Sequence, residues 1–200
     1  MYTVFRSFIK LIFSIYFNLK FEGKENIPKH GGVIYACNHR SYADPILLTL
    51  CVRKRFCYLA KEELFSSPVK AFFLRLLGAY PVVRGQGDMK VIDDSVERLK
   101  SGKNLAIFPE GTRSKDGKLG RGKSGVALIA SKTHADVVPV AVVYGENEKL
   151  HFRSKVIVRY GKPIAASELE ISDKPALRDI SRLKNRIMGA IAELLEDNAE

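Results

Sequence analysis

The chain has 200 residues, of which 46% are hydrophobic, and this length and composition fit one globular domain with a sizeable core. No stretch is repeated or of low complexity, which excludes a repeat protein and a largely disordered chain. The formal net charge of +11 points to an anionic partner, namely nucleic acid, an acidic carrier protein or an anionic membrane surface.

Residues 1–20 form the first distinctive segment, with the sequence MYTVFRSFIKLIFSIYFNLK. The segment contains Arg6, Lys10 and Lys20 but no acidic residue, and apolar side chains cover most of the helical circumference. Its longest apolar run is three residues, which is too short for a helix that spans a bilayer. It also lacks a clear signal-peptide cleavage site. We expect an amphipathic helix that contacts a membrane interface, with a helix packed into the core as the alternative.

The rest of the chain alternates between apolar runs and helical periodicity. Strands are predicted at 21–28 (a short strand and a turn), 33–37, 55–60, 80–83, 105–108, 137–144 and 156–160. Helices are predicted at 45–52, 68–77, 89–100, 125–133 and 176–195. This alternation predicts a single α/β domain over residues 21–200, with a mostly parallel mixed sheet covered by helices.

The turn after the 33–37 run contains a histidine and a carboxylate, His39 and Asp44, five positions apart. A neutral histidine can take a proton from an alcohol, and a nearby carboxylate can fix its tautomer and stabilise the imidazolium. Residues five apart do not share a face of a regular helix, so the pair needs a strand-to-helix turn. Asp44-Pro45 predicts that turn, because aspartate is a favoured N-cap and proline a favoured first helical residue. Taken alone, the pattern also fits a helix cap beside a loop histidine.

A second polar turn, residues 109–114, follows the 105–108 run and contains Glu110, Thr112 and Arg113. Backbone N–H groups, hydroxyls and a guanidinium at one strand end suit a phosphate or a developing oxyanion. Ligands of open α/β sheets gather at the carboxyl ends of strands. We therefore expect one edge of the sheet to bring together the polar residues that follow four predicted strands: His39, Lys61, Arg84 and Glu110.

At these residues the chain resembles the 1-acylglycerol-3-phosphate O-acyltransferases (lysophosphatidate acyltransferases) and their glycerolipid acyltransferase relatives. Residues 38–44 look like the first motif of that family, and residues 78–84 look like the second, with Arg84 in the phosphate-contacting place. Residues 108–114 look like the third motif and 138–140 like the fourth. A further familiar segment lies at 60–64. The matches occur in family order and together span roughly residues 38 to 140.

The resemblance implies transfer of a fatty acyl group from an acyl thioester to the free sn-2 hydroxyl of lysophosphatidate, which gives phosphatidate for phospholipid synthesis. His39 would be the general base and Asp44 would orient it. No Gly-x-Ser-x-Gly elbow occurs, which argues against a covalent intermediate. The substrate-binding residues implied are Lys61, Arg84, Glu110, Gly111, Thr112 and Arg113. Among them, the three cations are candidates for the acceptor phosphate. Glu110 would hold the loop or bind a glycerol hydroxyl, and Gly111 would allow close backbone approach.

No cofactor is implied besides acyl-coenzyme A or acyl carrier protein as co-substrate. Three cysteines, Cys37, Cys51 and Cys57, fit no metal-binding spacing, so we expect free thiols in a reducing compartment and no metal. We expect a peripheral or monotopic protein on the cytoplasmic face of the cell membrane, attached through residues 1–20. After the third motif, relatives often carry an aromatic residue and lysines, whereas residues 119–125 here are rich in glycine.

Three other functions are compatible with parts of the sequence. A nucleic-acid-binding module would explain the charge, but the basic residues are spread along the chain and no recognised binding motif is present. A non-catalytic membrane adaptor would not need both His39 and Asp44, which are intact. A related enzyme could acylate another acceptor, such as glycerol 3-phosphate or a lyso-aminolipid.

Overall fold

The computed structural model describes residues 2–82, 88–145, 150–169 and 175–196. Its centre is a seven-stranded sheet with the order β1-β7-β6-β2-β5-β3-β4. The strands are β1 (Asn18–Glu22), β2 (Ile34–Cys37), β3 (Phe56–Lys61), β4 (Ala79–Val82), β5 (Asn104–Ile107), β6 (Val137–Tyr144) and β7 (Lys155–Tyr160). Neighbouring strands run parallel except β6 and β7, which are antiparallel. The sheet is therefore mixed and mostly parallel, as the sequence predicts.

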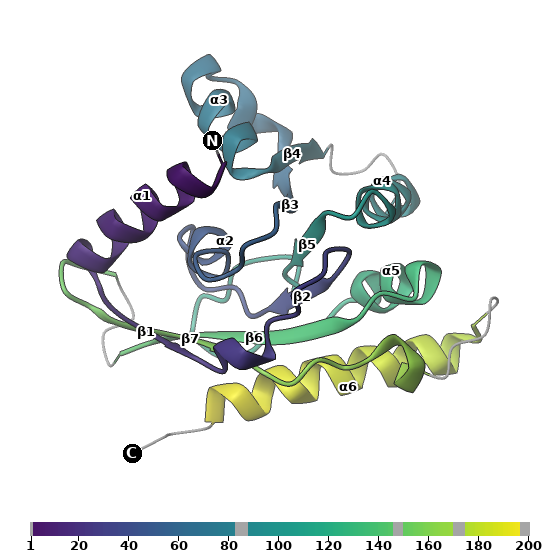
Figure 1. Cartoon of the computed structure of the whole chain (residues 1–200). Coiled ribbons are helices and arrows are strands. Elements are labelled where there is room, and N and C mark those ends of the chain that lie inside the picture. Colours follow the sequence, from purple (N-terminus) through teal and green to yellow (C-terminus); the bar gives the residue numbers. More distant parts are fainter. Residues whose placement is uncertain (1, 83–87, 146–149, 170–174, 197–200) are drawn as a thin grey trace.

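Helices cover both faces of the sheet (Figure 1). One face carries α1 (Tyr2–Tyr16), α2 (Asp44–Leu47) and α3 (Pro68–Leu77), and the other carries α4 (Asp88–Lys100), α5 (Gly125–Thr133) and α6 (Leu177–Glu196). Short 3₁₀ helices occur at η1 (Lys24–Asn26), η2 (Glu62–Phe65) and η3 (Ala166–Leu169).

The buried central strand β2 contributes to the hydrophobic core on both sides. Tyr35 and Cys37 pack into the cluster under α1, α2 and α3, whereas Ile34 and Ala36 pack into the cluster under α4, α5 and α6. This division follows from strand geometry, because successive side chains point to opposite faces. Two layers of helices around an apolar central strand make one core on each face of the sheet.

Two predicted elements differ from the structure. The helix predicted over 1–20 ends at Tyr16, and residues 18–20 begin β1, which pairs with β7 and half-buries Leu19 against the core. The helix predicted over 45–52 is α-helical only over Asp44–Leu47. Beyond Leu47 the backbone forms tighter i to i+3 hydrogen bonds, and the Thr49 hydroxyl donates to the Ile46 carbonyl, a local bond that competes with helix continuation.

The order of the strands decides where the two polar turns lie. β2 is flanked by β5 on one side and β6 on the other, and all three are parallel. Their carboxyl ends therefore meet at one edge of the sheet, where β2 leads into the first turn and β5 into the second. No helix in the described part of the chain combines the length and hydropathy that crossing a membrane requires.

Candidate active site

His39 and Asp44 are in direct contact. His39 Nδ1 lies 2.9 Å from Asp44 Oδ2, the Asp44 side chain is fully buried, and the His39 side chain is 18% exposed. The backbone N–H groups of Arg40 and Ser41 also donate to Asp44 Oδ2, each at 2.7 Å. Because that oxygen acts as an acceptor for both, Nδ1 carries the ring hydrogen and Nε2 keeps the lone pair that can take a proton.

The carboxylate of Asp44 does not cap the helix as the sequence predicts. Ala43 occupies the N-cap position of α2, and Asp44 is the first helical residue. The carboxylate instead turns back toward Arg40 and Ser41, because the loop between strand and helix folds around it. Because the carboxylate faces His39 and does not cap α2, the geometry favours a role for Asp44 in orienting the histidine.

Tyr144, at the end of β6, is a residue of this site that the sequence reasoning missed. Its hydroxyl donates to Asp44 Oδ1, so both carboxylate oxygens are occupied. Burial and the negative charge of Asp44 raise the Tyr144 pKa well above its ordinary value, so the phenol stays a donor. A tyrosine at the carboxyl end of a buried strand, after the Val-Pro-Val stretch, is the signal that could have pointed to it.

The other side of the histidine is fixed by the third motif. The ring stacks on Phe108, with centroids 4.1 Å apart and planes 23° apart. The backbone N–H of His39 donates to Glu110 Oε1 at 2.7 Å, and the backbone N–H of Ser114 donates to the His39 carbonyl at 2.7 Å. Ring, amide and carbonyl of His39 are thus all held by residues that follow β5.

Glu110 joins two loops through its two oxygens. Oε1 accepts from His39, and Oε2 accepts the Gly120 N–H at 2.8 Å. The side chain is buried, with 7% of the residue exposed. Of the two roles that the resemblance allows for Glu110, this geometry favours holding the loop over binding a glycerol hydroxyl, since both oxygens are engaged.

Asn38 fixes the start of the first turn. Its side chain accepts the Val142 N–H at 2.8 Å and donates to the Val142 carbonyl at 3.0 Å. The fourth motif, residues 138–140, lies within β6, where Pro139 pairs with Ala36. Residues 138–140 therefore place the strand that carries Val142 and Tyr144 beside β2, which is a structural contribution to the site.

Two of the three cations predicted for the acceptor phosphate, Arg113 and Lys61, lie within the described residues. Arg113 is exposed, with its guanidinium carbon 3.7 Å from the Tyr42 ring centroid and Nη2 donating to the Tyr42 hydroxyl at 3.0 Å. Lys61 ends β3 with its side chain exposed. Arg84, together with Val83, lies outside the described residues.

Two residues of the third motif give the loop its shape and its polar surface. Gly111 has a φ of 72°, a conformation that favours glycine, and its N–H donates to the Phe108 carbonyl at 3.0 Å. Thr112 is exposed beside it. Within the described residues, no group of His, Cys, Asp and Glu side chains is arranged to hold a metal ion.

The three cysteines are free thiols in the structure, and Cys37 and Cys57 are buried. Burial raises the pKa of the Cys57 thiol to about 11, and burial together with the charges of Asp44 and Glu110 raises that of Cys37. Both thiols are therefore poor nucleophiles at neutral pH.

Comparison with known proteins gives one consistent family. The family described as Acyltransferase matches residues 18–143. The chain is 30% identical over 197 residues to a 1-acyl-sn-glycerol-3-phosphate acyltransferase of Bacillus subtilis, covering 97% of this chain and 96% of the relative. It is 32% identical over 166 residues to a chloroplastic 1-acyl-sn-glycerol-3-phosphate acyltransferase of Arabidopsis thaliana, covering 78% of this chain and 46% of the relative. The chain thus spans about half the length of this relative and of a chloroplastic one from Brassica napus.

A solved structure is also similar. The 1-acyl-sn-glycerophosphate (LPA) acyltransferase PlsC from Thermotoga maritima matches with a TM-score of 0.72 and 27% sequence identity. The match covers 100% of this chain and 81% of that one.

Proposed function

Because this chain belongs to the 1-acyl-sn-glycerol-3-phosphate acyltransferase family, we propose that it transfers an acyl group from an acyl thioester to the sn-2 hydroxyl of lysophosphatidate. The observation that carries the proposal is the 2.9 Å contact between His39 Nδ1 and the buried carboxylate of Asp44. That contact directs Nε2 away from Asp44 as an available base. The product would be phosphatidate for phospholipid synthesis.

The reaction needs one proton to move twice. His39 Nε2 takes the proton from the lysophosphatidate hydroxyl while the oxygen attacks the thioester carbonyl, and a tetrahedral intermediate forms. When that intermediate collapses, the carbon–sulfur bond breaks and the thiolate takes the proton from the imidazolium. The buried carboxylate of Asp44 stabilises the imidazolium between the two steps, because a charge pair is stronger away from water.

The phosphate of the acceptor would bind to cations on the edge of the sheet that carries His39. Arg113 is the best-supported candidate, because its contact with Tyr42 of the first turn keeps the guanidinium next to the catalytic loop. Arg84 and Lys61 are further candidates from the family resemblance. Thr112 adds an exposed hydroxyl on the same loop.

The acceptor is a lipid, and one face of the molecule is suited to a membrane surface. Helix α1 exposes Val4, Phe8, Leu11 and Ile15, and α3 exposes Val69, Phe72 and Phe73. Both helices lie on the same face of the sheet (Figure 1), and neither contains an acidic residue. Lys70 and Arg75 give α3 an exposed positive charge, whereas Arg6 and Lys10 of α1 are half-buried against Val52 and Phe21. Apolar surface flanked by cations fits an anionic leaflet. We therefore propose peripheral attachment to the cytoplasmic face of the cell membrane through α1, with α3 as a second contact.

The experiment that tests the catalytic proposal is an acyl-transfer assay with lysophosphatidate vesicles. Acyl-coenzyme A and acyl carrier protein serve as alternative donors, and the wild type is compared with His39→Ala. We expect phosphatidate from the wild type and a loss of about 10²- to 10⁴-fold in kcat in the variant. Full activity of His39→Ala would remove His39 as the base. Product formed only with glycerol 3-phosphate or a lyso-aminolipid would reassign the acceptor.

A further inference from the structure

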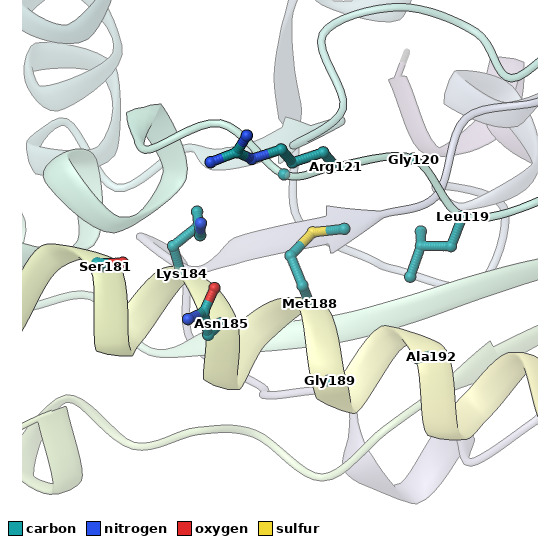
Figure 2. Close-up of a pocket in the computed structure, with 10 residues that line it drawn as sticks. Leu119, Gly120, Arg121, Ser181, Lys184, Asn185, Met188, Gly189 and Ala192 are labelled. Atoms are coloured by element: carbon teal, nitrogen blue, oxygen red, sulfur yellow. The ribbon is translucent and has the colours of Figure 1, made fainter.

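Two adjoining hollows form one groove that starts at the third motif. The first, of ≈ 440 Å³, is lined by Glu110 and Thr112 and by residues 119–121. The second, of ≈ 570 Å³, includes residues 119–121 again and continues along α6 past Lys184 and Met188 (Figure 2). The two hollows share residues 119–121, so they adjoin along this loop, and together they extend from the third motif to α6.

The end of the groove at α6 is cationic. Arg121 projects into it from the loop and Lys184 projects into it from α6 (Figure 2). Neither side chain has a hydrogen-bond or ion-pair partner among the residues that the structure describes, and no carboxylate lines this hollow. Ser181 and Asn185 add neutral hydrogen-bonding groups beside the two cations. Two unpaired cations that face one hollow are suited to a phosphate.

The carboxylates at the other end of the groove are already occupied. Asp116 Oδ1 accepts the Ser114 hydroxyl at 3.0 Å and the Lys118 N–H at 3.2 Å. Both oxygens of Glu110 accept backbone N–H groups, as described above. The acidic groups of the groove are therefore hydrogen-bonded to donors of neighbouring loops, and they lie at the end away from Lys184.

We propose that this groove binds the phosphopantetheine arm of the acyl donor, with its phosphate between Arg121 and Lys184 and its thioester toward the third motif. The inference rests on the proposed function and adds the donor site to it. Acyl-coenzyme A and acyl carrier protein share this arm, which has the thioester at one end and a phosphate ester at the other. Arg121 and Lys184 lie at the end beside α6, whereas Lys118 at the other end lines the same hollow as Asp116 and Glu110. The cation pair beside α6 therefore matches the phosphate ester of that arm. Arg113, which we assign to the acceptor phosphate, lines neither hollow.

The glycine-rich loop connects the groove to the residues that support the base. A side chain at Gly120 would place its Cβ 2.8 Å from Glu110 Oε2, and one at Gly122 would place its Cβ 2.6 Å from Met188. Glycine at these positions therefore lets the loop lie against Glu110 and α6 without displacing either side chain. Since Glu110 also holds the His39 amide, the same loop borders the groove and supports the base.

The first test compares steady-state kinetics of the wild type with the double variant Arg121→Ala/Lys184→Ala. The control is Lys100→Ala/Lys162→Ala, which removes the same charge from two exposed lysines outside the groove. Loss of two charge-assisted contacts should raise the donor KM about tenfold or more, with kcat and the lysophosphatidate KM unchanged. Arg113→Ala should give the opposite pattern, a raised lysophosphatidate KM. If the double variant has the same donor KM as the control, or if only its KM for lysophosphatidate changes, the proposal that the groove binds the donor is wrong.

The second test is calorimetric titration with 4′-phosphopantetheine itself. Binding by the wild type and the control, and its loss in Arg121→Ala/Lys184→Ala, would support the site. No binding by the wild type, or equal binding by all three proteins, would overturn it.

The kinetic assay also distinguishes the two donors. A raised KM for both donors supports binding of the phosphate that they share, whereas a raised KM for acyl-coenzyme A alone would contradict the proposal and assign the groove to the nucleotide. If the wild type transfers no acyl group, the proposed function fails, and the titration still decides on the groove.

Discussion

Tyr144 and Asp44 are 100 positions apart in the chain, and the Tyr144 hydroxyl donates a hydrogen bond to the Asp44 carboxylate inside the core. The other oxygen of that carboxylate faces His39 Nδ1 and two backbone N–H groups. The orientation of the base thus depends on β6 as well as on its own loop. Tyr144 acts on the reaction only through Asp44, so it is a positioning residue.

Tyr144→Phe should therefore weaken catalysis without leaving a large cavity in the core. The ring remains, but one oxygen of a buried carboxylate loses its donor, which costs about 1–3 kcal/mol of folding stability. We expect kcat to fall about tenfold or more, because Asp44 gains freedom to rotate away from His39. Thermal unfolding and the transfer assay check the two effects. Tyr35→Phe is a matched control, because the Tyr35 hydroxyl is buried on the same side of the sheet and has no hydrogen-bond partner among the described residues. Equal kcat in the wild type and Tyr144→Phe would contradict the positioning role.

Glu110→Gln should test whether the charge of Glu110 is needed to hold His39 and Gly120, because glutamine keeps the size of the side chain. A glutamine has the same size, but only one of its two terminal atoms accepts a hydrogen bond, so either His39 or Gly120 loses its acceptor. We expect kcat to fall about tenfold, since one charge-assisted hydrogen bond is lost and the other is weakened. Hydrogen exchange at the Gly120 amide should become faster. A variant with wild-type kcat and wild-type hydrogen exchange at Gly120 would show that the two hydrogen bonds of Glu110 are dispensable.

Membrane attachment should depend on α3 as well as on α1. Phe72→Ser/Phe73→Ser removes apolar surface that is exposed in the structure, and each phenylalanine that enters a leaflet contributes about 1.5–3 kcal/mol. We expect at least tenfold weaker binding to anionic vesicles in a flotation assay, with unchanged circular dichroism. Leu177→Ser is the control, because Leu177 is exposed on α6 at the opposite face of the sheet. Equal flotation of the wild type and the α3 variant would limit the contact to α1.

Alkaline pH should unfold the protein through its buried tyrosines. Burial raises the pKa of Tyr80 to about 12 and raises those of Tyr35, Tyr144 and Tyr160 as well. Because the folded pKa lies above the unfolded value near 10, these phenols favour the folded state below pH ~10, and that contribution falls as the pH rises further. A titration followed by absorbance at 295 nm should show these four ionising only as circular dichroism is lost. Ionisation of all eight tyrosines near pH 10 in a folded protein would contradict this.

The sequence predicted His39 and Asp44 as a pair, because the two residues are close in the chain and lie at a strand end, but the same spacing also fitted a helix cap. The structure shows the contact between the two side chains. The sequence also predicted that Glu110 would reach the same edge, since parallel strands share the direction of their carboxyl ends. It did not predict Tyr144, because its place beside Asp44 depends on which strand pairs with β2. The end of α1 at Tyr16 was missed for a similar reason. Residues 18–20 are strand only because β7, near the other end of the chain, pairs with them.

The two hydrogen bonds between Asn38 and Val142 have a consequence for how the enzyme loses activity on heating. They attach the start of the catalytic loop to β6, and Ser114 and Glu110 attach it to the segment after β5. A loop held at both flanks by central strands opens only when those strands separate, so it belongs to the same cooperative unit as the sheet. The midpoint of thermal inactivation should therefore coincide with that of global unfolding, without an earlier inactive but folded state.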